Sequence, residues 1–332
     1  MIFKEYRTIY PLKYIWKAIT STNSTAIYQS FEFNVLYYQY RVTSVSNIRK
    51  GNTACRFIVG YENGDPKCIA PLAIDKSPKK TIRLLGHGTN AGYLDYIYED
   101  PKSVNKLHNY VVEKYSDFDI DFIFVSENSP LYGLLNVSDT FNNYAIHFNG
   151  YETYFNSLSK STKQNIRTAY NRMKTDEKEY VLSIYTSYEQ LGKMCLTEIN
   201  QLYHKRKADW IDGQPIDKKT QNKVLRRDVI YQGVRKLDNP VIAVLRIDSV
   251  IAAFFIGFSY DNGVCIPRLA IDIEYGRYSP GVVLINEFLK TLPDNAPYIF
   301  DLCRGDEKYK SSLGGEKSLT YRLSKEPEEK DV

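Results

Sequence analysis

The chain has 332 residues, of which 43% are hydrophobic and 14% aromatic, and its formal net charge is +5. Single hydrophobic cores tend to split beyond ~250 residues, so this length predicts two domains. The small net charge argues against a broad nucleic-acid-binding surface and favours local sites for phosphorylated ligands, so we expect no nucleic-acid partner.

No stretch approaches the ~20 consecutive apolar residues of a membrane helix, and the charged first residues do not resemble a signal peptide. We therefore expect a cytoplasmic protein that is not inserted in a membrane. The five cysteines are scattered, odd in number and never spaced as C-x-x-C. This pattern predicts reduced thiols packed in a core, with neither a disulfide framework nor a metal site.

The first half of the chain predicts a domain at residues 1–149. Residues 86–92 contain three glycines and an asparagine, so they predict a flexible loop, either facing a substrate or forming a plain turn. Alternating apolar residues around Asn63-Gly64-Asp65 predict a β-hairpin. The predicted elements are helices at 14–20 and 31–41, strands at 54–61, 67–73, 81–85 and 93–98, a helix at 101–115 and a strand at 119–125.

The second half predicts a domain at 150–324, followed by a charged tail at 325–332 that we expect to be disordered. The helix predicted at 187–210 carries an apolar stripe, including Met194 and Tyr203, that we interpret as core. Its order of elements repeats that of the first half, which favours a duplication. The elements are helices at 151–158 and 162–174, a strand at 180–186, helices at 187–210 and 218–236, strands at 241–247, 251–260 and 264–271, a helix at 280–292, a strand at 298–302, a short helix at 308–313 and a strand at 319–323.

Two stretches concentrate ionisable side chains. The helix at 162–174 places Lys163 and Arg167 on one side, either as a solvated basic face or as a phosphate clamp. The stretch 298–315 is an apolar strand that carries Asp301, then a charged turn and a short helix. Such a strand end is where ligands of open sheets usually bind, and burial of Asp301 should raise its pKa.

The run Phe-Asp-Leu-Cys-Arg-Gly-Asp-Glu-Lys-Tyr-Lys at 300–310 resembles the C-terminal signature of the double-domain, cellulose-biosynthesis-type branch of the GNAT acyltransferases. Patches at 30–34, 85–88 with Asp95-Tyr96, and 278–281 agree with this family in order and spacing, so the resemblance spans about residues 30 to 322. It implies an α+β fold of two tandem GNAT-like domains, each a mixed twisted sheet flanked by helices. Within the branch, the chain is most similar to acyltransferases that act on a nucleotide-linked 3-amino-3,6-dideoxyhexose.

The resemblance implies that the second domain binds acyl-CoA. A helix start supplies backbone N–H groups for the pyrophosphate, and the segment before 281 fits this role. The pantetheine would then lie along the strand at 264–271 through backbone hydrogen bonds. The residues expected to bind coenzyme A are Leu269, Ile271, Arg277, Tyr278, Ser279, Gly281 and Val282.

Acyl transfer needs an unprotonated amine and a protonated thiolate leaving group. We expect Asp301 to accept the amine's proton or to orient the acceptor, and Tyr309 to protonate the thiolate. The alternative for Arg304 is an internal salt bridge with Asp301, Asp306 or Glu307. The residues expected to bind the acceptor are His87, Asp95, Lys163, Arg167, Arg304, Asp306, Glu307 and Lys310.

The function expected from the resemblance is an acyl-CoA-dependent N-acyltransferase for a nucleotide-linked, dTDP-type amino-deoxy sugar in surface polysaccharide synthesis. A Fem-like transferase that uses aminoacyl-tRNA is one alternative, although no sustained heptad run indicates the coiled-coil arm of such proteins. A non-catalytic binding protein for polysaccharide assembly is the other. A homo-oligomer is compatible with the sequence.

Overall fold

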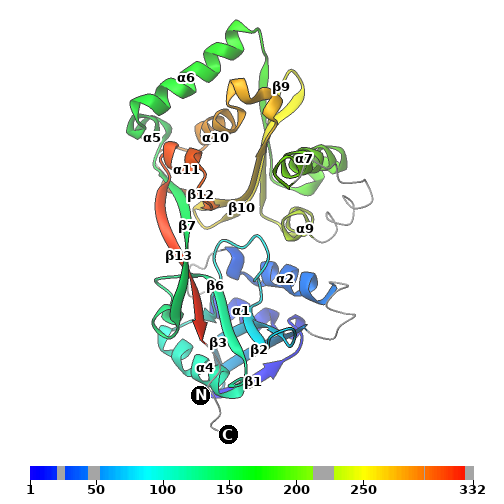
Figure 1. Ribbon diagram of the computed structural model, residues 1–332, viewed down its shortest axis with the longest axis vertical. Helices are drawn as coiled ribbons and strands as arrows, with labels where there is room; N and C mark the ends of the chain where they lie inside the picture. The colour runs from blue at the N-terminus through cyan, green and yellow to red at the C-terminus, as the bar shows by residue number, and fades with distance from the viewer. Residues whose placement is uncertain (21–26, 44–52, 212–227, 295, 326–332) are drawn as a thin grey trace. The chain divides into compact units, whose positions relative to one another are not determined.

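The computed structural model describes residues 1–20, 27–43, 53–211, 228–294 and 296–325 (Figure 1). The chain divides into two compact units. Unit 1 comprises Met1–Asn143 and Leu319–Val332, and unit 2 comprises Tyr144–Ser318. The predicted domains, 1–149 and 150–324, stay a prediction, because a domain is a part of the chain that can fold alone, whereas these units are defined by compactness. Of the expected tail, residues 326–332 lie outside the described residues.

Unit 1 is a twisted sheet covered by helices. Its strand order is β1-β2-β3-β4-β6-β13, with β5 paired to β3. Its strand pairs are antiparallel except for β4 and β6, which are parallel. The elements are β1 (Ile2–Tyr6), η1 (Tyr10–Leu12), α1 (Lys13–Thr20), η2 (Ile27–Gln29), α2 (Phe31–Thr43), β2 (Thr53–Glu62), β3 (Asp65–Asp75), β4 (Thr81–Leu84), β5 (Ile97–Tyr98), α4 (Pro101–Lys114), β6 (Asp119–Ser126), η3 (Pro130–Gly133) and β13 (Glu316–Lys325).

Unit 2 is a mixed sheet with helices on both faces. Its strand order is β7-β12-β11-β10-β9-β8, to which β7 contributes residues 144–148, its first residues belonging to unit 1; β11 and β12 are parallel and the pairs from β8 to β11 are antiparallel. The helix α10 lies on one face of this sheet, and α7 and α9 lie on the other (Figure 1). The elements are β7 (Asn136–Phe148), α5 (Tyr151–Ser157), α6 (Lys160–Thr175), β8 (Tyr180–Tyr185), α7 (Tyr188–Ile211), α9 (Val229–Lys236), β9 (Pro240–Ile247), β10 (Val250–Tyr260), β11 (Gly263–Ile271), η4 (Ile273–Tyr278), α10 (Pro280–Lys290), β12 (Tyr298–Arg304) and α11 (Lys308–Ser312).

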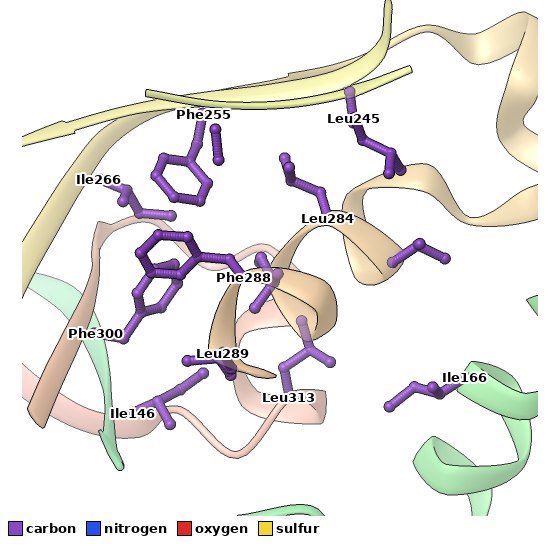
Figure 2. Close-up of a cluster of buried hydrophobic side chains, with 14 of the residues drawn as sticks. Ile146, Ile166, Leu245, Phe255, Ile266, Leu284, Phe288, Leu289, Phe300 and Leu313 are labelled. Atoms are coloured by element: carbon purple, nitrogen blue, oxygen red, sulfur yellow. The ribbon is translucent and has the colours of Figure 1, made fainter. Parts of the chain in front are cut away.

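The core of unit 2 fixes α10 against the sheet. Three aromatic rings meet there, Phe255 of β10, Phe288 of α10 and Phe300 of β12, with centroids 4.9 to 5.7 Å apart. Figure 2 shows them pointing toward one another, with Leu284 and Leu289 of α10 beside them. Burial of aromatic side chains contributes strongly to stability, so this cluster packs the C-terminal half of α10 against β10 and β12.

Two strands were not predicted, and one prediction is partly wrong. The strand β1 lies in a charged N-terminal segment, and β7 begins with polar residues that are depleted in strands. The prediction of a strand at 93–98 is wrong for residues 93–96, because only Ile97–Tyr98 form β5. Elsewhere the apolar runs at β9, β10, β11 and β12 lie where they were predicted.

The helix α7 contains a break that sequence periodicity missed. Gly192 has φ 73° and ψ 160°, which are not helical angles. The break changes the phase of the apolar stripe, and Met194, predicted as core, is 80% exposed. Of the helix predicted at 218–236, α9 begins at Val229, and residues 218–227 lie outside the described residues.

All five cysteines are free thiols and buried, as predicted. Among the residues that the structure describes, no helix is long and apolar enough to cross a membrane. The same residues contain no group of three or more His, Cys, Asp or Glu side chains that could hold a metal ion.

Candidate functional site

The strands β11 and β12 pair over a short distance and then separate. Their parallel register joins Gly263, Val264 and Cys265 to Ile299, Phe300 and Asp301. Beyond this point β11 continues to Ile271 and β12 to Arg304. Against β10, the register shifts between the pairs of Cys265 and Arg268, a β-bulge that bends β11. The sheet of unit 2 is therefore open between these two strands.

A cavity of about 760 Å³ occupies this opening. It lies within unit 2, and its walls are the free ends of β11 and β12, the start of α10, the segment around α11, and one residue of α7. The residues that line it include Tyr203, Arg268, Leu269, Ile271, Gly276, Ser279, Gly281, Val282, Cys303, Arg304, Glu307, Tyr309 and Lys310.

The start of α10 brings backbone to the cavity. Ser279 has the left-handed angles φ 48° and ψ 53°, and Pro280 occupies the first helical turn. The N–H groups of Val282 and Val283 both donate to the carbonyl of Ser279, at 3.0 and 3.1 Å. A Cβ atom at Gly281 would lie 3.0 Å from Cγ2 of Ile271, so a side chain larger than glycine would crowd the cavity wall.

Five of the seven expected coenzyme A residues line the cavity, namely Leu269, Ile271, Ser279, Gly281 and Val282. Arg277 and Tyr278 do not line it. The Arg277 Nε atom lies 3.0 Å from Oδ2 of Asp176, and the Tyr278 hydroxyl donates to the same oxygen at 2.9 Å. These two side chains therefore tie η4 to the end of α6.

Asp301 lies behind the cavity wall. Its side chain is buried, and its Oδ1 accepts a hydrogen bond of 2.7 Å from the backbone N–H of Cys303. Burial raises the pKa of Asp301 to about 6. It is not among the lining residues. Its catalytic role stays a prediction, and its observed contact supports Cys303, which does line the cavity and has a φ of 58°.

Lys310 shapes the turn between β12 and α11. Its Nζ atom donates to the carbonyls of Cys303 at 3.2 Å and Arg304 at 2.6 Å, and it lies 3.0 Å from Oε2 of Glu307. The lysine is 2% exposed. Its ammonium group is therefore engaged within the protein, which favours a structural role over the predicted contact with substrate.

Three other predicted residues lie at the cavity. Tyr309 is half-buried, packs against the hydrophobic core, and has a pKa raised by burial. Arg304 and Glu307 are exposed on the wall of the cavity. Asp306, between them, is exposed and does not line it.

The remaining predicted residues are not brought to this cavity. Lys163 donates to the carbonyl of Asn156 at 2.7 Å, and Arg167 is exposed on α6. His87 and Asp95 belong to unit 1, where burial lowers the pKa of His87 to about 4 and raises that of Asp95 to about 7. Their roles in binding an acceptor stay predictions.

Tyr203 and Arg268 are among the lining residues that sequence reasoning missed. Tyr203 was assigned to the core stripe of α7, and Arg268 was not considered. Arg268 is 3% exposed and pairs with Asp228 through Nη2 and Oδ2 at 2.7 Å. The sequence feature that could have identified Arg268 is a charged residue inside the apolar run at 264–271. An arginine is almost never buried unless it has a partner.

The comparisons with known proteins agree with this geometry. Residues 160–311, which include the whole cavity lining, match the family model described as an acetyltransferase (GNAT) domain. No curated protein matches the chain in sequence.

Solved structures extend the likeness to the whole chain. A conserved protein of unknown function from Bacteroides thetaiotaomicron VPI-5482 is 14% identical with a TM-score of 0.58, over 98% of this chain and 99% of that one. FemX is 10% identical with a TM-score of 0.58, over 97% of both chains. A tandem GNAT protein from the clavulanic acid biosynthesis pathway is 10% identical with a TM-score of 0.51, over 99% of this chain and 100% of that one. Residues 160–311 are therefore similar in sequence to a GNAT acetyltransferase domain, and the chain has the predicted fold of mixed sheets and helices that tandem GNAT proteins share.

Proposed function

We propose that the protein is an acyl-CoA-dependent N-acyltransferase. The observation that carries this proposal is the cavity between the separated ends of β11 and β12, with the start of α10 on its wall. Separated strands leave backbone groups of β11 without a strand partner on that side, so an extended ligand can bind along them. The match of residues 160–311 to a GNAT acetyltransferase domain supports the same reading.

The residues on the walls fit coenzyme A. By the geometry of a helix start, the Gly281 N–H has no carbonyl of its own helix to bond, and the positive end of the helix dipole favours an anion there. Leu269, Ile271 and Val282 give an apolar wall for the pantetheine arm. Acyl-CoA would supply an acyl group activated as a thioester.

In the proposed reaction the amine nitrogen attacks the thioester carbonyl, a C–N bond forms and the C–S bond breaks. The amine loses one proton and the departing sulfur gains one. Tyr309, which lines the cavity, is the proposed donor to sulfur. The proposed acceptor of the amine's proton is one of two carboxylates, Asp301 behind Cys303 or Glu307 on the cavity wall. The raised pKa of Asp301 brings it closer to the range that suits a proton acceptor near neutral pH.

We propose a nucleotide-linked amino-deoxy sugar as the acceptor, for surface polysaccharide synthesis. Arg304 on the cavity wall is suited to a phosphate of such a molecule, because arginine binds phosphate with directed hydrogen bonds. This finer assignment rests on the resemblance of the 300–310 run to that branch of acyltransferases.

The second candidate is a Fem-like transferase that uses aminoacyl-tRNA. Its support is the fold similarity to FemX over 97% of both chains. Thermal unfolding with coenzyme A, acetyl-CoA or charged tRNA separates the two candidates. A ligand at about 100 times its Kd stabilises the folded state by about 2.7 kcal/mol.

We expect coenzyme A and acetyl-CoA to raise the Tm and charged tRNA to leave it unchanged. Release of free thiol from a panel of acyl-CoAs with amino-sugar nucleotides then separates an enzyme from a binding protein. If charged tRNA raises the Tm and coenzyme A does not, the Fem-like transferase becomes the favoured function and the acyl-CoA-dependent enzyme is contradicted.

A further inference from the structure

A stack of three side chains stands at the cavity wall opposite α10. The guanidinium carbon of Arg268 lies 4.2 Å from the ring centroid of Tyr203, on α7, and 4.7 Å from that of Tyr231, on α9. Tyr203, which belongs to α7, lines the cavity. Tyr231 is buried and closes the stack on the protein side.

The stack is held rigidly. Arg268 projects from β11, pairs with Asp228, and is almost completely buried. Asp228 in turn caps α9, because its Oδ1 accepts hydrogen bonds from the N–H groups of Ile230 at 2.9 Å and Tyr231 at 3.3 Å. The carboxylate offsets the guanidinium charge, so the arginine supports the Tyr203 ring without leaving an unpaired cation behind it.

The two sides of the cavity differ in chemistry. Leu269 packs against the core on the α10 side, whereas its neighbour Arg268 packs against α7 and α9, because successive strand residues point to opposite faces. The α10 side carries the apolar residues and helix start proposed for coenzyme A. The α7 side presents the Tyr203 ring, backed by the Arg268 guanidinium, which that ligand does not require.

We infer that the Tyr203 ring is a stacking platform for the pyranose ring of the amine acceptor. This inference rests on the proposed function. The amine must reach the open end of the sheet, so the ring that carries the amine is the part of the acceptor nearest the cavity centre. An amino sugar presents a face of C–H groups, which packs on an aromatic face, and a ring fixed in advance loses little entropy on binding.

The test compares the wild type with Tyr203→Phe and Tyr203→Leu. Phenylalanine keeps the aromatic face and removes the hydroxyl, whereas leucine keeps apolar bulk and removes the face. The probe is a dTDP-linked 3-amino-3,6-dideoxyhexose with acetyl-CoA as donor. We expect Tyr203→Phe to keep the KM for the sugar within about twofold and Tyr203→Leu to raise it about tenfold, the upper range for an aromatic contact. The calorimetric Kd for coenzyme A should not change in either variant.

Saturation-transfer NMR of the same sugar nucleotide on the wild type gives a second readout that does not need turnover. The strongest saturation should fall on the C–H protons of the pyranose. A KM for the sugar that is the same in Tyr203→Leu and wild type would overturn the platform and leave the enzyme proposal intact. Equal losses in the Phe and Leu variants would assign the role to the hydroxyl and also overturn it. A wild type that binds coenzyme A but neither binds nor acylates the sugar would overturn both the platform and the sugar acceptor, while the coenzyme A site would stand.

Discussion

Oδ1 of Asp301 accepts a hydrogen bond from the backbone N–H of Cys303 at 2.7 Å, two residues after β12 makes its last pair with β11. Cys303 has a left-handed φ of 58°, and its carbonyl accepts from Lys310. Cys303 is thus held at its N–H by the Asp301 carboxylate and at its carbonyl by the Lys310 ammonium group. These contacts fix the path along which β12 separates from β11 beside the cavity.

Asp301→Asn should lower turnover by at least about tenfold, the low end of what a positioned acid or base contributes. Asparagine keeps an oxygen that can accept from Cys303, so the fold should persist. The measurement is steady-state release of thiol with saturating acetyl-CoA, with circular dichroism as the control for folding. Near-normal turnover in a folded variant would remove Asp301 from the mechanism.

The raised pKa of Asp301 predicts a pH dependence of stability. The pKa is about 6 in the folded chain, against an ordinary value of about 3.9. Between these values the folded state binds more protons than the unfolded state, so the contribution of Asp301 to the free energy of unfolding falls as pH rises from about 4 to 6.

Asp301→Asn lacks this titration. Urea unfolding at pH 4 and pH 7 should therefore show the variant gaining stability relative to the wild type at the higher pH. Other titrating groups, including Asp95, are present in both proteins and cancel in the difference. Equal changes in the two proteins would mean that Asp301 does not titrate in this range.

Tyr309→Phe should also lower turnover by at least about tenfold, because it removes the proposed proton donor to sulfur. The affinity for coenzyme A should stay within about twofold, since the ring remains on the cavity wall. A matched control is Tyr180→Phe on β8, because Tyr180 is 37% exposed and does not line the cavity. If the two variants turn over at the same rate, Tyr309 is not the acid.

Lys310→Met should reduce the free energy of unfolding by about 1–3 kcal/mol, because the carbonyls of Cys303 and Arg304 lose a buried donor. Lys308→Met, at an exposed position of the same short helix, should change it by less than about 0.5 kcal/mol. Urea unfolding of both variants measures the difference. Equal stabilities would show that the lysine does not hold the turn.

The fold of unit 2 could be predicted from the sequence where the pattern of apolar and polar side chains determines the secondary structure. The strands β9, β10 and β11 are long apolar runs, and Pro280 marks the start of α10. The pattern failed where other forces decide. Gly192 breaks α7 through a backbone conformation that other residues rarely adopt, and β7 gains its strand state from pairing rather than from its polar residues.

The candidate site was predicted in part for the same reason. The residues on one continuous stretch, such as Gly281 with Val282, or Glu307 with Tyr309, lie together because they are close in sequence. Tyr203 reaches the cavity from a helix more than sixty positions away, so only the fold brings it there. The direction of Arg277 toward Asp176 likewise depends on the packing of α6 against η4.

The central claim is that coenzyme A binds in the opening between β11 and β12. Calorimetric titration of coenzyme A into Gly281→Val tests it most directly. The valine would be forced toward Ile271 and into the path of the ligand, whereas Gly276→Ala, also at the cavity, adds a Cβ in open space. We predict wild-type affinity within about twofold for Gly276→Ala and no measurable binding for Gly281→Val. Unchanged affinity in a folded Gly281→Val protein would contradict the proposed site.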